Sequence, residues 1–360
     1  MDLPVMPPVK PMLAKPLPGI PANPAGEAPE FAYEPKWDGF RCIVFRDGDE
    51  VVLGSRNVKP LTRYFPELIG PLRASLPERA VVDGEIVVVI DDHLAFDALQ
   101  QRIHPADSRV QQLAAETPAT FIAFDVLAVG ARDVRGLRFA DRRALLEAMA
   151  PAFVDGVHLC PLTTDTATAD DWFTRFEGAG LDGLIVKPLD GTYVSDKRVQ
   201  FKVKHTRTAD VVVAGYRVHK DGRGVGSLLV GLHDADGRLH HVGVASSFRA
   251  DLRASLVEEL GPYVLDDPAE HPWSRWVDPE AHTGTLMPGA PSRWSGGRDA
   301  SWIPLEPRLV AEVRYEAVQH GRFRGVSRFV RWRPDRTPES CRYDQLEQAD
   351  PVPLTEVLHS

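Results

Sequence analysis

Short β-type runs alternate with amphipathic helical patterns along the first part of the chain, and several of these runs meet at tight turns. Turns are indicated at Asp47-Gly48 and Asp83-Gly84, because Asp-Gly is typical of β-hairpins. Hairpins require antiparallel pairing, so the pattern favours an α+β fold over a regular βαβ array. Helical periodicity covers residues 61–75, 96–103 and 141–150. The predicted strands cover residues 31–33, 42–45, 51–53, 80–82, 86–90, 121–127 and 183–187.

The character of the sequence changes near residue 206. Beyond it, five β-type runs are interrupted by one helical pattern at 249–260, which is consistent with an OB-type barrel. We therefore predict a first domain over residues 1–206 and a second domain over residues 207–360. Residues 266–302 are rich in Pro, Gly and Trp, and they are predicted to form a long irregular loop. The five strands are predicted at 211–218, 227–233, 239–245, 309–317 and 329–333.

Composition is that of an ordinary globular protein. The 360 residues are 43% hydrophobic and 26% charged, which is enough for two domains with separate cores. No apolar run approaches the roughly 20 residues that span a bilayer, and the N-terminus lacks a secretory pattern. Three widely spaced cysteines argue against a disulfide framework or a Cys-rich zinc site. We therefore expect a cytoplasmic protein with no membrane partner.

Lys36 is the first candidate for chemistry. It stands in Glu34-Pro35-Lys36-Trp37-Asp38-Gly39-Phe40-Arg41, between two predicted strands. Attack on phosphorus requires the neutral amine, which a neighbouring cation, a metal-bound water or partial burial would favour. Gly39 permits a tight turn, and Arg41 has the fork geometry that binds a phosphate oxygen pair. The alternative is an exposed lysine at a strand end beside an ordinary turn.

Several charged residues lie in or beside predicted strands at positions where a strand of the hydrophobic core would have apolar residues. Glu85 precedes a run of apolar residues, so a carboxylate near a buried strand needs a partner. Lys202 and Lys204 are two residues apart and share one face of a strand, which suits a triphosphate better than a core. Phe124 lies in a strand that is also readable as pure core, and core is the preferred interpretation of Phe121.

A net charge of −9 argues against a protein that coats nucleic acid non-specifically. One segment departs from this balance, since residues 308–336 hold eight arginines interleaved with aromatic side chains. Either a solvated strand face or contact with nucleic-acid phosphates explains such a run, and the aromatic residues favour phosphate contact. The candidate DNA-binding residues are Arg322, Arg324, Arg328 and Arg331.

Six motifs follow one another from residue 34 to residue 336, and together they resemble those of the Lys-x-Asp-Gly nucleotidyltransferases. The similarity is greatest to the ATP-dependent DNA ligases, and among them to the compact actinobacterial ligases called ligase C. It implies an ATP-grasp-like adenylation (nucleotidyltransferase) domain followed by an OB-fold domain. It also implies ATP and Mg²⁺ or Mn²⁺ as cofactors. The motifs are Lys36 to Arg41, Ser55 to Asn57, Asp83 to Glu85, Phe121 to Leu127, Asp182 to Lys187 with Gln200 to Lys204, and Phe329 to Arg336.

The resemblance also implies roles for individual residues. Lys36 would be the nucleophile that becomes adenylated, and Phe124 would stack on adenine. Glu85 would bind the metal or the ribose hydroxyls, and Asp182 would hold the metal. Asp182 stands where most relatives have Glu, so direct ligation by its shorter side chain is in doubt. Arg336 stands where most relatives have Lys, which keeps the charge but not the geometry. The expected nucleotide-binding residues are Glu34, Arg41, Arg56, Glu85, Phe124, Lys187, Lys202, Lys204, Arg333 and Arg336.

The implied activity is sealing of nicks in duplex DNA, in repair or recombination, by a monomer. The protein would be nucleoid-associated when on DNA, and repair polymerases or end-binding proteins are candidate partners. The alternatives are an RNA ligase or a capping-type nucleotidyltransferase, which share the Lys-x-Asp-Gly core. A catalytically silent module that binds nucleic-acid ends is a third alternative, opposed by the retained charged residues.

Overall fold

The computed structural model describes residues 1–104, 106–274, 301–319, 321–347 and 349–360. The chain divides into two compact units. The first unit comprises Met1–Lys204 together with Ala349–Ser360, and the second comprises His205–Gln348. The last residues therefore belong to the first unit, whereas the sequence prediction of a domain over 207–360 had placed them in the second.

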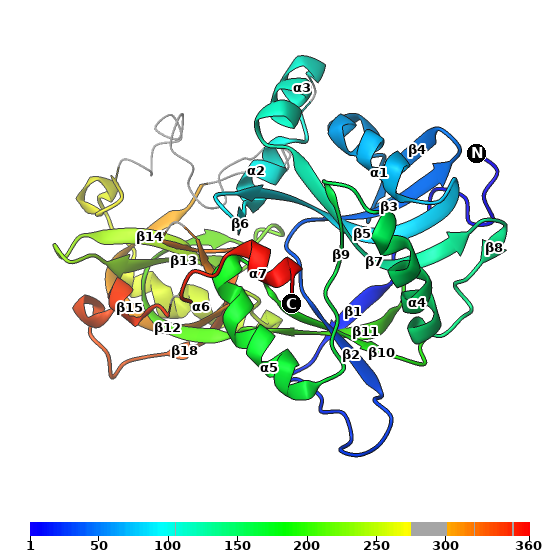
Figure 1. The fold of residues 1–360 in the computed structure, drawn as a ribbon. Coiled ribbons are helices and arrows are strands. Elements are labelled where there is room, and N and C mark those ends of the chain that lie inside the picture. The colour runs from blue at the N-terminus through cyan, green and yellow to red at the C-terminus, as the bar shows by residue number, and fades with distance from the viewer. Residues whose placement is uncertain (105, 275–300, 320, 348) are drawn as a thin grey trace. The chain divides into compact units, whose positions relative to one another are not determined.

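The first unit contains two β-sheets (Figure 1). A four-stranded sheet has the order β1-β11-β10-β2, in which only β1 and β11 run parallel. A seven-stranded sheet has the path β4-β3-β5-β7-β8, with β6 paired to β5 and β9 paired parallel to β7. The bounds are β1 Leu13–Pro16, β2 Phe31–Pro35, β3 Phe40–Asp47, β4 Glu50–Ser55, β5 Arg79–Ile90, β6 His93–Leu94, β7 Ala119–Val129, β8 Arg132–Asp133, β9 Val157–Leu159, β10 Gly183–Pro188 and β11 Arg198–Lys204.

One predicted turn is wrong. The Asp47-Gly48 hairpin joins β3 to β4 as expected, with Gly48 at φ +60°. Asp83-Gly84, in contrast, lies inside β5, which unites the two strands predicted at 80–82 and 86–90. A Cβ on Gly84 would stand 2.3 Å from Cζ of Phe121, so glycine is present because β7 packs closely there. The same dipeptide therefore arises from a turn in one case and from close strand packing in the other.

Helices cover parts of the first unit, and those predicted at 96–103 and 141–150 are present with shifted ends. The pattern at 61–75 is not one helix: it forms two 3₁₀ turns, Thr62–Tyr64 and Pro66–Leu68, and then α1. Pro66 explains the interruption, because proline lacks the N–H of a helix interior. α3 and α5 were not predicted. The bounds are α1 Ile69–Ser75, α2 Phe96–Gln101, α3 Asp107–Glu116, α4 Phe139–Met149, α5 Thr166–Arg175 and α7 Leu354–Leu358, with 3₁₀ turns at Ala150–Ala152 and Phe176–Ala179.

The second unit is a closed five-stranded barrel with strand order β12-β13-β14-β18-β15. All five predicted strands and the inserted helix are found, and the OB-fold prediction is confirmed. The predicted loop at 266–302 is only partly described, because residues 275–300 lie outside the described residues. The bounds are β12 Arg207–Val218, β13 Val225–His233, β14 Leu239–Ser246, α6 Ala250–Leu260, β15 Ile303–Tyr315, β16 Val318–Gln319, β17 Arg322–Phe323 and β18 Ser327–Trp332, with 3₁₀ turns at Gly261–Tyr263, Pro268–Glu270, Pro338–Ser340 and Tyr343–Gln345.

The C-terminal segment is anchored on the first unit by α7. Leu354 and Val357 are buried in the apolar cluster that includes Trp172 and Phe176. The amide of Val352 donates to the carbonyl of Gly178 over 3.2 Å, and the amide of Leu354 donates to the carbonyl of Asp92 over 2.8 Å. Backbone hydrogen bonds and apolar burial together fix this segment.

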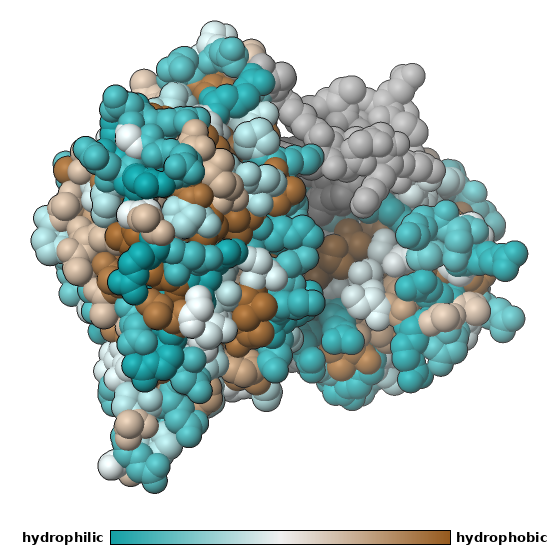
Figure 2. Space-filling view, turned by 90° about the vertical axis from the view of Figure 1, so that its right-hand side faces the viewer, coloured by the Kyte–Doolittle hydropathy of each residue, from teal (hydrophilic) through white to brown (hydrophobic). Residues whose placement is uncertain are grey.

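The face of the molecule seen in Figure 2 is mainly hydrophilic, with apolar residues interspersed among charged ones. Among the described residues, no helix combines the length and the apolar character needed to cross a membrane.

Candidate active site

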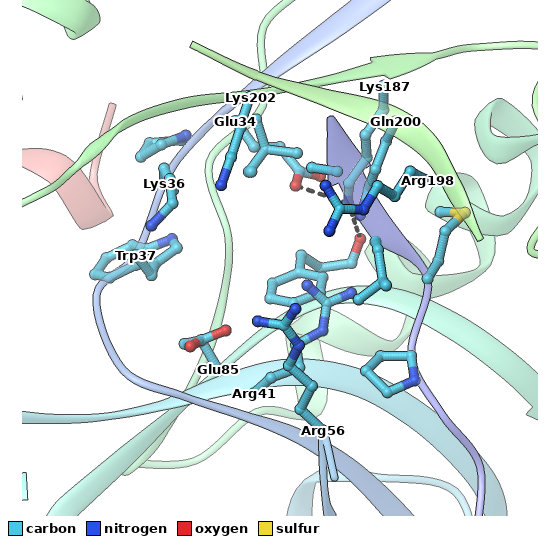
Figure 3. Close-up of a pocket in the computed structure, with 17 residues that line it drawn as sticks. Glu34, Lys36, Trp37, Arg41, Arg56, Glu85, Lys187, Arg198, Gln200 and Lys202 are labelled. Atoms are coloured by element: carbon cyan, nitrogen blue, oxygen red, sulfur yellow. Dashed lines mark hydrogen bonds and ion pairs between the residues drawn. The ribbon is translucent and has the colours of Figure 1, made fainter. Parts of the chain in front are cut away.

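A cavity of about 210 Å³ lies in the first unit, and both sheets contribute side chains to it. The four-stranded sheet provides residues from β2, β10 and β11, whereas β3, β5 and β7 of the seven-stranded sheet provide Arg41, Glu85 and Phe124. Figure 3 shows the two groups of side chains facing each other across the cavity. The lining residues are Pro11, Met12, Leu13, Ala14, Glu34, Pro35, Lys36, Trp37, Arg41, Arg56, Glu85, Phe124, Ile185, Lys187, Arg198, Gln200 and Lys202.

Lys36 follows directly after β2, at one side of this cavity (Figure 3). Its Nζ donates to Oδ2 of Asp182 over 2.8 Å, and the two side chains are only 19% and 14% exposed. The backbones are joined as well, because Lys36 N donates to Gly183 O over 2.8 Å and Asp182 N donates to Lys36 O over 3.1 Å. The amine is therefore held in a defined place by partners on both its side chain and its backbone.

Two lysines of β11 add positive charge beside this pair. Nζ of Lys204 lies 3.4 Å from Oδ2 of Asp182, so Asp182 is shared between Lys36 and Lys204. Lys202 is two residues away on the same face of β11, and it lines the cavity. Three lysines therefore gather at this end of the cavity, which suits an anionic ligand.

Two glycines make the close approach of these segments possible. A Cβ on Gly39 would stand 2.2 Å from the carbonyl oxygen of Ile86, and a Cβ on Gly183 would stand 2.1 Å from that of Val203. Gly183 also has φ +126°, where other residues are strained. Gly39 was predicted to serve a tight turn, but the structure shows that it serves close packing against β5.

Glu34, Lys187 and Phe124 form a buried group at another part of the cavity. Nζ of Lys187 lies 2.7 Å from Oε2 of Glu34 and donates to the carbonyl of Phe124 over 3.0 Å. The same Nζ lies 4.8 Å from the ring centroid of Phe124, within cation–π range. Burial raises the pKa of Glu34, and Lys187 and Arg143 oppose that rise.

Arg41 is fixed by a carboxylate that sequence reasoning did not single out. Its Nε and Nη2 donate to Oδ1 and Oδ2 of Asp83 over 2.6 and 2.7 Å, and Asp83 is fully buried. The hydroxyl of Tyr193 donates to Oδ2 of Asp83 over 2.6 Å. The guanidinium carbon of Arg41 lies 4.2 Å from the ring centroid of Phe124. Asp83 and Tyr193 therefore set the position of Arg41 over the aromatic ring.

Glu85 lies two residues further along β5 and faces the cavity (Figure 3). Burial raises its pKa to about 7, against the lowering effect of Arg41 and Lys36. Among the described residues, no group of three or more His, Cys, Asp or Glu side chains is arranged to hold a metal ion. Any metal here would therefore depend on one or two carboxylates and on ligand oxygens, as is typical of Mg²⁺.

The second unit carries the remaining candidate residues. Arg333 donates from Nη1 to both carboxylate oxygens of Asp210 over 2.9 and 3.0 Å, and from Nη2 to Asp335 over 2.7 Å. Nε of Arg336 lies 3.4 Å from Oδ2 of Asp210. Asp210 thus holds both arginines of the last motif together, although nothing in its sequence context pointed to it.

The four candidate DNA-binding arginines lie on or beside β17 and β18 of the same unit. Arg328 and Arg331 are exposed on β18, and Arg331 donates to Glu312 of β15 over 2.7 Å. Arg322 lies on β17 and Arg324 directly after it, and both are half-buried. Arg328 and Arg331 therefore lie on a barrel strand, whereas Arg322 lies in the separate two-stranded sheet of β16 and β17.

The structure brings most of the predicted nucleotide site together in the first unit. Eight of the ten predicted nucleotide-binding residues lie there, and seven of them line the cavity. Neither Asp182 nor Lys204 lines the cavity. Asp182 contacts Lys36 directly, and Lys204 contacts Asp182. Arg333 and Arg336 lie in the second unit. Sequence reasoning gave no role to Asp83 and Gln200, although both lie within the motif segments, and it missed Tyr193 and Arg198, which lie outside them. The seven that line it are Glu34, Arg41, Arg56, Glu85, Phe124, Lys187 and Lys202.

Comparison with known families gives the class of the protein. Residues 11–204 match the family described as "ATP dependent DNA ligase domain". Residues 221–336 match the family described as "ATP dependent DNA ligase C terminal region". The chain belongs to the ATP-dependent DNA ligases.

The chain is similar in both length and sequence to DNA ligases of the ligase C type. The chain is 54% identical over 365 residues to DNA ligase C of Mycobacterium tuberculosis, covering 99% of both chains. It is 54% identical over 350 residues to DNA ligase C2 of Mycolicibacterium smegmatis, covering 96% of both. A solved structure from a study of Lig E DNA ligases superposes with a TM-score of 0.55 at 16% identity, over 90% of this chain and 99% of that one, which shows the fold alone. The predicted likeness to actinobacterial ligase C is confirmed.

Proposed function

We propose that Lys36 carries the adenylate of this DNA ligase and that the cavity beside it binds ATP. The neutral amine of Lys36 attacks the α-phosphorus, a P–N bond forms, the bond to the β-phosphate oxygen breaks, and pyrophosphate leaves. An oxygen of a DNA 5′-phosphate then attacks the adenylate phosphorus and frees the lysine. Finally the 3′-hydroxyl attacks the activated 5′-phosphorus, so that the strand is sealed and AMP departs.

The hydrogen bond between Lys36 and Asp182 is the observation that carries this proposal. It fixes the amine at the entrance of a cavity that has lysines at one end and an aromatic ring further in. Asp182 accepts a hydrogen bond from Nζ of Lys36, so it fixes the position of the amine. Lys202 and Lys204 offset the charge of the phosphates and of the departing pyrophosphate.

The residues present fit a divalent cation that is bound jointly with the nucleotide. Glu85 and Asp182 would hold the cation through hard carboxylate oxygens, which suit Mg²⁺ or Mn²⁺ bound together with ligand phosphates and waters. Such a cation would supply Lewis-acid stabilisation of charge at phosphorus.

The remaining part of the nucleotide would extend from Lys36 towards Phe124. Arg41 and Arg56 line this side and are suited to ribose or phosphate oxygens. The ring of Phe124 supports stacking of a purine, which is worth of order 1 kcal/mol beyond area burial. In the second unit, Arg333 and Arg336 are the groups that would orient pyrophosphate, and Asp210 keeps them together.

The substrate we propose is nicked duplex DNA in a repair or recombination setting. Arg322, Arg324, Arg328 and Arg331 would contact its phosphates, so that binding weakens as salt rises. A repair polymerase or an end-binding protein would bring the enzyme to its site. Both matched families are DNA ligases, so neither the RNA-ligase or capping alternative nor the silent end-binding module gains support.

Labelling with ATP that carries ³²P at the α-position tests the proposal. The native protein should become labelled in the presence of Mg²⁺ or Mn²⁺, and nicked DNA should discharge the label with formation of a sealed product. Lys36→Ala should abolish labelling, whereas Lys197→Ala, which alters an exposed lysine outside the cavity, should leave it unchanged. Full labelling of Lys36→Ala would overturn the assignment. A nicked duplex with an RNA strand separates DNA from RNA preference.

A further inference from the structure

Gln200 is a buried polar residue to which neither the motifs nor the reaction steps assign a role. It lies on β11, lines the same cavity as Lys36, and is 2% exposed. Its side-chain oxygen Oε1 is buried without a hydrogen-bond partner among the described residues. A buried polar atom without a partner costs about 1–3 kcal/mol of stability, so its presence requires a reason.

The position of Gln200 along β11 places it at the base end of the cavity. Lys204, four residues further along β11, contacts Asp182, which in turn contacts Lys36. Lys204 therefore lies at the end of the cavity where the α-phosphate would react. Four residues of strand correspond to about 13 Å. Gln200 follows in register after Val186↔Phe201, so it lies beside Lys187, the residue that contacts Glu34 and Phe124. In Figure 3, Lys36 and Gln200 lie on opposite sides of the cavity.

Glu34 offers a useful contrast in the same place. Its Oε1 also has no hydrogen-bond partner among the described residues. Nη1 of Arg143 lies 3.7 Å from this oxygen and likewise has no hydrogen-bond partner among the described residues. A small shift would join these two atoms, so Glu34 does not require a ligand. Among the described residues, Oε1 of Gln200 has no hydrogen-bond partner, and the neighbouring Nζ of Lys187 is already engaged with Glu34 and Phe124.

We propose that the amide oxygen of Gln200 accepts a hydrogen bond from the exocyclic amino group of the adenine of bound ATP. Gln200 is then a specificity-determining residue of the ligase. An acceptor in a buried site rejects a base that lacks the amino group, because the acceptor would remain without a partner. The inference rests on the proposed nucleotide site and deepens it, since it names the group that reads the base.

The test compares native protein with Gln200→Leu and Gln200→Glu in single-turnover self-adenylation. The nucleotides are ATP and purine riboside triphosphate, which lacks only the C6 amino group. Gln200→Leu should raise the KM for ATP about tenfold with little change in kcat, and should leave the KM for the purine analogue within about twofold. Gln200→Glu keeps an acceptor and should retain the preference for ATP.

A melting curve of the ATP-free protein provides the second readout. Because Leu removes a buried group that lacks a partner, Gln200→Leu should raise the melting temperature by about 2 °C while it weakens ATP binding. A residue with a purely structural role would not combine these two effects. Gln200 also lines a second cavity of about 230 Å³, where a bound water alone would satisfy it.

Two results would overturn the inference. One is an unchanged ratio of KM values for the two nucleotides in Gln200→Leu, which indicates a water or packing role. The other is an equal loss of affinity for both nucleotides together with a lower melting temperature. Failure of the nucleotide site itself is recognised separately, because native protein would then form no adenylate on Lys36 with either nucleotide.

Discussion

The side-chain amine of Lys36 donates to Oδ2 of Asp182 over 2.8 Å, and the same oxygen lies 3.4 Å from Nζ of Lys204. One aspartate therefore positions the proposed nucleophile and separates it from a second lysine. Without Asp182 these two cations would repel each other at close range. The relationship gives Asp182 a positioning role in addition to its proposed role in metal binding.

Removal of Asp182 should impair the first step of the reaction most strongly. Asp182→Ala leaves Lys36 unfixed and takes away a metal ligand, so we expect self-adenylation to slow by about 100-fold or more. Asp182→Glu keeps the carboxylate and should retain most of the rate. Rapid-quench measurement of enzyme–AMP formation checks both variants, and near-native adenylation by Asp182→Ala would contradict the assigned role.

Asp83 should matter for stability and for nucleotide binding. Asp83→Ala leaves the guanidinium of Arg41 without its buried partner, and breaking such a pair costs about 3–5 kcal/mol. Tyr193→Phe removes the hydrogen bond to Asp83 and the one that the Met12 amide donates to the hydroxyl over 3.1 Å, and it should cost about 2 kcal/mol. Urea unfolding measures both losses. Equal effects of the two substitutions would show that the Asp83–Arg41 pair is not the main contributor.

The pH dependence of the metal-free protein should reveal Glu85. Burial raises its folded-state pKa to about 7, above the ordinary value of 4.5, so the folded state binds the proton more tightly. Stability from this group is present below about pH 4.5, falls as pH rises towards 7, and is constant above that. Melting curves in EDTA should show this decline in the native protein and a flatter profile in Glu85→Gln. Identical profiles would refute the raised pKa.

The C-terminal segment should stabilise the first unit. A Cβ at Gly178 would stand 1.8 Å from the carbonyl oxygen of Asp350, so Gly178→Ala should displace the segment and lower the melting temperature. Gly70 offers a matched control in α1, since nothing lies within 4 Å of a Cβ there. Gly70→Ala should be neutral or stabilising by up to about 1 kcal/mol. Equal melting temperatures of the two variants would show that the C-terminal segment does not stabilise the first unit.

The sequence predicted the β-strands of the barrel well because most of them are rich in β-branched and other apolar residues and are bounded by turn residues, as in residues 227–233. It failed where one signal has two physical origins. Asp83-Gly84 has the composition of a turn, yet Gly84 is required by contact with Phe121 across strands. Motif positions gave the candidates around Lys36, but the partners that position them depend on tertiary contacts. Asp210 reaches Arg333 over more than 120 residues of sequence.

Identification of the adenylated residue tests the central claim most directly. The native protein is incubated with ATP and Mg²⁺, digested, and examined by mass spectrometry for the peptide that carries AMP, before and after addition of nicked DNA. The account predicts AMP on the side chain of Lys36 and its loss when the nick is sealed. Adenylate on another residue, or adenylate on Lys36 that nicked DNA does not discharge, would contradict it.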